Sequence, residues 1–299
     1  MLLTKNTIQR VINGGLLLSI ILPTAFVQAL DFSYGKGTLD FKSSINPFIS
    51  SDVSLDIDTL SLAERHKTLR NSKYYYHFKL DYFDSDFVNK MTDIARIPVS
   101  TPLPIVDTAI DDYIAKYTKM PVPTDYRVHG LDFDIGLGYD LYKDEKSLVG
   151  VSVNTGISTP FMKMRNIKNS LKYFLGALNT FDTKVKTYKI GVSAVAQQKI
   201  NDQFSVSGSA TLNYQTGEMD NDLVGSGIDV DGSYFKLDLN LKYKPASFKK
   251  LYLTGGYTYN KWDYNGMTVK VPVGQFKVPR NMDMAFESNN VYLGVGYQF

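Results

Sequence analysis

Long stretches of this chain alternate between apolar and polar residues, and this period of two limits the possible folds more than any other feature. Residues 291–299 place a large apolar residue at every second position, and residues 235–243 do the same with lysine, aspartate and asparagine in between. Side chains of a β-strand point alternately to two faces, so each segment has one apolar and one polar face. We therefore predict an all-β fold, a closed antiparallel transmembrane β-barrel with its apolar face in lipid.

Ten such segments follow one another along the chain. Eight are clear, and they cover residues 74–82, 131–140, 149–157, 188–196, 204–214, 235–243, 251–259 and 291–299. The segment with Val53, Leu55 and Ile57 is weaker. Residues 32–41 change phase across Gly35-Lys36-Gly37, where we expect a glycine bulge that absorbs one extra residue. We predict about ten strands, and eight or twelve stay open because the first two segments are faint.

The connections between the segments also fit a barrel. Short links near residues 143–146, 199–202 and 245–247 alternate with long links at 85–127, 158–183 and 263–284. Outer-membrane barrels have short periplasmic turns and long extracellular loops. We therefore place the insertions 85–127 and 158–183 outside the cell and both chain ends on the periplasmic side.

Two of the long links contain apolar residues at helical spacing, which predicts short helices in the extracellular loops. The residues in the first link are Phe87, Met91 and Ile94, then Val106, Ile110, Ile114 and Tyr117; those in the second are Met164, Ile167, Leu171, Leu175 and Leu178. We expect these helices to pack on one another as an external cap. Insertion into the barrel mouth, contact of the neighbouring lysines with lipopolysaccharide, and an apolar ligand site stay open.

The first residues read as an export signal. Lys5 and Arg10 precede the apolar stretch 16–26, and Val27-Gln28-Ala29 is a small-residue cleavage pattern. We predict a signal peptide over 1–29 and a barrel over 30–299.

The last segment carries the most specific pattern. It presents Val291, Leu293, Val295, Tyr297 and Phe299 on one face, and this alternation ending in phenylalanine resembles the assembly signal of bacterial outer-membrane β-barrel proteins. The resemblance implies the cell outer membrane of a Gram-negative bacterium as the location. It also implies outer-membrane lipid and lipopolysaccharide, periplasmic chaperones and the barrel-assembly machinery as partners.

Aromatic residues gather at the two ends of the apolar faces, as expected at two bilayer interfaces. The inner rim holds Tyr74, Tyr139, Phe204, Tyr243, Tyr297 and Phe299, and the outer rim holds Tyr82, Tyr188, Tyr214, Phe235 and Tyr259. The 33 basic and 30 acidic residues nearly cancel, which argues against nucleic acid as a partner. The chain has no cysteine, so disulfides and thiolate metal sites are excluded, and we expect no cofactor.

The polar faces carry charges that we expect to point into the lumen. They are Lys79, Asp81, Asp132, Asp134, Asp140, Lys189, Lys236, Asp238 and Lys242. They can pair across the lumen, or they can line a narrow pore that orients permeating solutes. We predict a narrow channel or small-solute binding protein with a polar lumen. The alternative is a non-conducting structural or surface-interaction barrel, and the oligomeric state stays open.

An enzyme is the third possibility, because a chain of this size and strand number is similar to the omptin proteases. The resemblance implies acidic residues and a histidine at the outer rim. We place His66 in a periplasmic turn, His77 near mid-strand, and His129 on the lipid face, so no such set appears. The acidic stretch from Glu218 to Asp231 reads as a solvated hairpin rather than a calcium loop. We predict no catalytic residues and no metal site.

Overall fold

The protein is described by a computed structural model, which covers residues 29–45, 49–69, 72–95, 119–165, 182–222, 225–248, 250–271, 274–277 and 282–298. All regular elements of these residues are β-strands. They are β1 (Ala29–Ile45), β2 (Ile49–Thr68), β3 (Tyr74–Ser85), β4 (Val88–Ala95), β5 (Lys119–Lys143), β6 (Ser147–Ser158), β7 (Phe161–Arg165), β8 (Thr183–Lys199), β9 (Phe204–Asn221), β10 (Gly225–Tyr243), β11 (Leu251–Val271), β12 (Gly274–Lys277) and β13 (Met282–Gln298). The predicted signal peptide 1–29 lies outside the described residues apart from Ala29, and so does Phe299.

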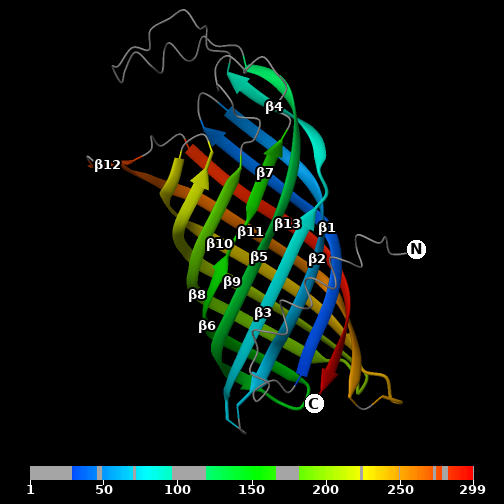
Figure 1. The fold of residues 1–299 in the computed structure, drawn as a ribbon. Coiled ribbons are helices and arrows are strands. Elements are labelled where there is room, and N and C mark those ends of the chain that lie inside the picture. Colours follow the sequence, from blue (N-terminus) through cyan, green and yellow to red (C-terminus); the bar gives the residue numbers. More distant parts are fainter. Residues whose placement is uncertain are drawn as a thin grey trace, which may run out of the picture.

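The long strands form one closed antiparallel sheet. The order is β1-β13-β11-β10-β9-β8-β6-β5-β3-β2, and β2 pairs again with β1 (Figure 1). The closing pair is continuous, from Ala29 opposite Gln298 to Ile45 opposite Met282. A closed sheet satisfies its backbone hydrogen bonds internally, which a strand in lipid requires. No helix of the described chain is long and apolar enough to cross a membrane.

Three short strands extend the end of the barrel that carries the long connections. β4 pairs with β5 and β2, β7 pairs with β5 and β8, and β12 pairs with β11. Figure 1 shows β4 and β12 at this end, opposite the end where β13 finishes.

Much of what the sequence indicated as extracellular loop is therefore strand, and the helix expected around Phe87 and Met91 is wrong. These residues adjoin or lie in β4, which pairs with β5 from Val88 opposite Tyr126 to Ala95 opposite Lys119. A ladder of backbone hydrogen bonds stabilises the strand more than three apolar residues at helical spacing stabilise an isolated helix. Met164 lies in β7, and the other predicted helical residues lie outside the described residues.

The outward face of the middle of the barrel is apolar and exposed. On β8, Ile190 and Val192 are 61% and 57% exposed, whereas Lys189 and Ser193 on either side of them are buried. The same holds on the neighbouring strands, where the exposed residues include Leu131, Ile135, Leu137, Val149, Val151, Val153, Leu212, Leu239, Leu241, Leu253, Val291, Leu293 and Val295. A transmembrane β-strand needs about 9–11 residues to cross the bilayer.

Above the apolar belt, on the extracellular side, the polar residues of each strand point outward and the apolar residues point into the barrel. On β8, Lys184 and Lys186 point outward while Val185 is buried inside; on β10, Asp231 points outward while Val230 is buried. The faces reverse because the medium around the barrel changes from hydrocarbon to water where the strands leave the bilayer. Apolar side chains then have to turn inward to escape water.

This exchange corrects the expected glycine bulge in β1. The register of β1 with β2 and β13 is unbroken through Gly35 and Gly37. Phe32 faces lipid and Leu39 faces the interior because the strand leaves the membrane between them, without an inserted residue.

Whether a residue faces lipid or the lumen predicts how much stability the barrel loses when that residue is replaced by arginine. Leu239 lies near the middle of the belt and is 47% exposed, so Leu239→Arg should destabilise the barrel by about 2–4 kcal/mol. Ser207 faces the lumen beside a cavity, so Ser207→Arg is the matched control and should cost much less. Urea unfolding in lipid vesicles measures both, and equal costs would mean that the faces are assigned wrongly.

Candidate functional site

The centre of the lumen is filled by ion pairs, which we call the charge layer: Lys79, Asp81, Asp132, Asp134, Lys189, Lys236 and Asp238. Lys189 lies 2.6 Å from Asp132 and 2.7 Å from Asp134. Lys236 lies 3.1 Å from Asp81, 3.3 Å from Asp134 and 3.4 Å from Asp132. Three ammonium groups thus stand among four carboxylates, and all seven side chains are buried. Such groups stabilise one another only as a complete set.

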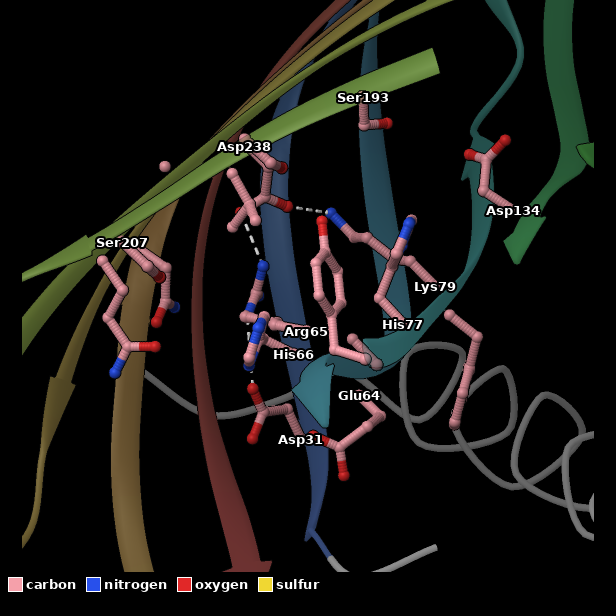
Figure 2. Close-up of a pocket in the computed structure, with 18 of the residues that line it drawn as sticks. Asp31, Glu64, Arg65, His66, His77, Lys79, Asp134, Ser193, Ser207 and Asp238 are labelled. Atoms are coloured by element: carbon pink, nitrogen blue, oxygen red, sulfur yellow. Dashed lines mark hydrogen bonds and ion pairs between the residues drawn. The ribbon is translucent and has the colours of Figure 1, made fainter. Parts of the chain in front are cut away.

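Arg65 completes the charge layer and was missed by the sequence analysis. Its guanidinium donates to Asp238 at 2.6 Å and to Asp31 at 3.2 Å, and Lys79 donates to the other oxygen of Asp238 at 2.6 Å. Figure 2 shows Arg65 between the two carboxylates. The sequence analysis placed the neighbouring His66 in a turn, but β2 continues to Thr68 and Arg65 points into the lumen.

The expectation that His66 lies in a periplasmic turn is wrong for the same reason. His66 lies in β2 and forms a 2.8 Å hydrogen bond with Asp140 of β5, over the intervening strand β3. Lys143 is 3.4 Å from the same carboxylate. Lys242 lies over the ring of Tyr252, 3.4 Å from its centre. All nine charges predicted for the lumen therefore lie on inward faces of their strands.

Tyrosine hydroxyls supply further hydrogen bonds to the carboxylates. Tyr234 donates to Asp132 at 2.7 Å, and Tyr292 donates to Asp238 at 3.1 Å. The ring of Tyr234 also lies 4.0 Å from the ammonium of Lys189. These contacts lower the cost of burying the charges.

The extracellular half of the lumen is packed with apolar side chains, which we call the apolar plug. It consists of Leu39, Phe41, Val53, Leu55, Ile57, Phe83, Val122, Tyr126, Val128, Met162, Met164, Val185, Met219, Ile228, Val230, Tyr234, Trp262, Tyr264, Met267, Met284 and Phe286. The prediction of a polar lumen is therefore wrong for this half. The rings of Phe41 and Phe286 lie 5.0 Å apart, and those of Tyr234 and Trp262 lie 5.5 Å apart. These two pairs lie on neighbouring strands, whereas the ring of Phe83 on β3 lies 6.0 Å from that of Trp262 on β11, so side chains from distant strands also meet inside the barrel.

The plug also accommodates its few polar atoms. The indole of Trp262 donates to Ser158 at 2.7 Å, and the hydroxyl of Tyr126 lies 3.0 Å from Ser51 and bonds with Thr92. Burial in the plug raises the pKa of Tyr126 and of Tyr264. Both hydroxyls stay protonated, so the plug carries no charge at these positions.

The opposite half of the lumen contains a cavity of about 130 Å³, which we call the vestibule. Arg65, Lys79 and Asp238 line one side of it (Figure 2). β8 and β9 contribute hydroxyls and amides, namely Ser193, Gln197, Ser205, Ser207, Ser209 and Thr211. A groove at the periplasmic rim shares His66 and Lys242 with the vestibule. The vestibule is therefore polar and ends at the charge layer.

One serine and one histidine meet in the vestibule although they are far apart in sequence. The Nε2 atom of His77 lies 3.1 Å from Ser152 and 3.0 Å from Asn154. Gly136 allows this contact across β5, since a Cβ there would lie 2.2 Å from Nε2. A catalytic triad orients the two ring nitrogens toward different partners, whereas here both partners share one nitrogen. Ser152 also donates to Asn154 at 2.9 Å, so the three side chains form one hydrogen-bond network.

The remaining predicted site residues lie on the lipid side. Val291, Leu293, Val295 and Tyr297 are exposed on the outward face of β13. His129 lies outward on β5, with its ring 4.7 Å from that of Phe161. Among the described residues, no group of three histidine, aspartate or glutamate side chains could hold a metal ion.

Comparison with known proteins identifies the fold. No family model and no curated protein sequence matches the chain. Among solved structures, the outer membrane protease OmpT of Escherichia coli matches with a TM-score of 0.56 and 9% identity, over 91% of this chain and 96% of that one. The transport unit of the autotransporter AIDA-I of Escherichia coli matches with a TM-score of 0.38 and 9% identity, over 97% of each chain. The translocator domain of NalP of Neisseria meningitidis has a TM-score of 0.36 and 11% identity, over 98% of each. The chain therefore has the closed β-barrel fold of the outer membrane protease OmpT, with an exposed apolar belt on its outward face.

Proposed function

We propose that this protein is a ten-stranded, non-conducting outer-membrane barrel that works at the cell surface through its rigid extracellular half. The observation that supports the proposal is the apolar plug. A conducting pore needs a continuous path of water between polar walls. Phe83 on β3 and Trp262 on β11 are 4% and 1% exposed and their rings lie 6.0 Å apart across the interior, which leaves no room for a water path between them.

The charge layer is a second barrier below the plug. Each of its ammonium groups contacts carboxylates of other strands, so the ion pairs tie opposite walls together. A permeating solute would have to break several of these pairs at once. This favours mutual pairing over a pore lined by free charges.

The outward face of the extracellular half is suited to binding a partner. Its strands continue the hydrogen-bonded ladder above the belt, and its outward face carries charges of both signs. Lys184 and Lys186 lie on β8, and Asp229 and Asp231 lie on β10. Ordered strands with charged outward faces can bind a partner with little loss of conformational entropy.

A hydrolase is the other class to consider, because OmpT is a protease. His66 and His77 lie in the membrane-embedded lumen, and His129 packs on Phe161. Among the described residues, none of the three forms a hydrogen bond or ion pair with two carboxylates at the extracellular mouth. We propose that the protein is not an enzyme.

Conductance in planar bilayers tests the closed lumen. We expect no stepwise current from the purified full-length protein. A variant lacking residues 96–118, which connect β4 and β5, should also stay silent, because the plug and not this connection closes the barrel. Current from the wild type would overturn the proposal, and current from the deletion variant alone would identify a loop gate.

A further inference from the structure

The vestibule lies between strands from opposite walls of the barrel. In the ring of long strands, four strands separate β2 from β9 in either direction, so these two face each other across the lumen. Arg65 on β2 and Ser207 on β9 both line the cavity, and Figure 2 shows them on different sides of it. The volume of about 130 Å³ has room for about ten water molecules. The vestibule is therefore large enough for a small molecule.

The wall formed by β8 and β9 presents polar groups that the protein leaves unbonded. In the part of the chain that the structure describes, four half-buried side chains of this wall form no hydrogen bond: Gln197, Ser205, Ser207 and Ser209. By contrast, Ser193 on β8 lies 2.6 Å from the hydroxyl of Thr211. A hydroxyl or amide without a protein partner bonds to water or to a ligand. The wall therefore offers a row of donors and acceptors to the cavity.

The charges of the vestibule balance one another. Apart from two histidines, its charged lining consists of four basic side chains and four carboxylates, which are Arg65, Lys79, Lys236, Lys242, Asp31, Glu64, Asp134 and Asp238. Three of the basic side chains already form ion pairs with three of these carboxylates. An ion that entered this space would leave one charge without compensation in a largely dry site. The lining therefore favours a neutral ligand.

Two of the charged side chains keep hydrogen-bonding capacity for such a ligand. Lys242 on β10 forms no ion pair within the described residues, and its ammonium lies over the ring of Tyr252. Only one carboxylate oxygen of Glu64 accepts a hydrogen bond from a described group, the backbone amide of Ala29 at 2.9 Å. Since Glu64 is on β2, donors and acceptors face the cavity from both walls. A molecule with hydroxyls around its whole edge can use both.

The spacing of the serines fits a sugar ring. Serines at every second position of β9 are about 7 Å apart along the strand. Hydroxyls on opposite edges of a six-membered sugar ring have a similar separation, so one ring can reach two neighbouring serines. Each hydroxyl both donates and accepts, as the unbonded serine and glutamine side chains also do.

We propose that the vestibule binds one neutral monosaccharide. Ser205, Ser207 and Ser209 bond to hydroxyls on one edge of the sugar, and Lys242 and Glu64 bond to hydroxyls on the others. The groove at the periplasmic rim, which shares Gln197, Ser205 and Lys242 with the vestibule, is the entrance. The site opens at the end opposite the extracellular half, so it goes beyond the surface role proposed above and does not depend on it.

Saturation-transfer NMR of the folded full-length protein in detergent micelles, with D-glucose as the probe, tests this site. We expect transfer from the wild type to glucose. In the variant S205A/S207A/S209A we expect about tenfold lower affinity, because the bonds to three hydroxyls are lost. The matched control S43A/S44A/S54A removes three hydroxyls from the extracellular parts of β1 and β2, and we expect wild-type affinity.

Two further measurements test the place and the charge of the ligand. Ser207→Phe fills the vestibule without adding charge, and we expect it to abolish transfer in a barrel that still shows heat-modifiable migration. D-glucuronate differs from glucose by its carboxylate, and we expect much weaker binding to the wild type. No transfer from the wild type, equal affinity of the two triple variants, or full binding by Ser207→Phe would overturn the site. Equal binding of glucuronate and glucose would overturn the choice of a neutral ligand.

Discussion

Replacing Lys236 with methionine is expected to destabilise the barrel by about 3–5 kcal/mol, because it leaves buried carboxylates without their shared cation. Lys236 is the one residue within 3.4 Å of Asp81, Asp132 and Asp134 together among the described ion pairs. Lys189 contacts two of these carboxylates and cannot neutralise three. Equilibrium unfolding in urea, with the protein in lipid vesicles, measures the loss.

The matched control removes a carboxylate together with the cation. Asp81 is the acceptor nearest to Lys236, so Lys236→Met with Asp81→Asn should recover part of the lost free energy. A loss below about 1 kcal/mol for Lys236→Met would resemble an exposed ion pair and would contradict a dry charge layer.

Truncation of Phe286 to alanine is the second large effect, with an expected loss of about 3–5 kcal/mol. Phe286 is fully buried, and its ring contacts those of Phe41 at 5.0 Å and Tyr264 at 6.3 Å. The change leaves a cavity that the closed ring of strands cannot collapse to fill. The same unfolding measurement applies.

Val291→Ala on the same strand is the control for Phe286→Ala. Val291 is 63% exposed on the lipid face, so its truncation leaves no internal cavity and should cost far less. If the two variants lost equal stability, the interior at Phe286 would not be packed.

The sequence alone was enough to predict the membrane part of the barrel. In the membrane, apolar residues face lipid and polar residues face the lumen, so the two alternate strictly along each strand. The sequence therefore showed that Val192 and Leu239 face lipid and that Ser193 and Asn240 face the lumen. The pattern also placed all nine lumen charges on inward faces. The sequence did not show which of these charges form ion pairs, because Lys79 and Asp238 come together only when the sheet closes into a barrel.

The extracellular half was misjudged for a physical reason. Where strands leave the bilayer the solvent changes, and the apolar face of each strand changes side. In β1 this change of face was interpreted as a bulge. In β5 it concealed from the sequence analysis that the strand extends beyond Leu131 toward Lys119. Arg65 and the contact of His77 with Ser152 depend on strand ends and on long-range register, which carry no local signal.

The central claim is that packed side chains close the lumen, and the single tryptophan of the chain reports on it directly. Trp262 is 1% exposed, lies between the rings of Phe83 and Tyr234, and donates to Ser158. Fluorescence of the folded full-length protein in lipid vesicles, with iodide added, measures its access to water. We predict a blue-shifted emission that iodide does not quench until urea unfolds the barrel. Quenching in the folded state, with an emission maximum like that of free tryptophan, would contradict a closed lumen.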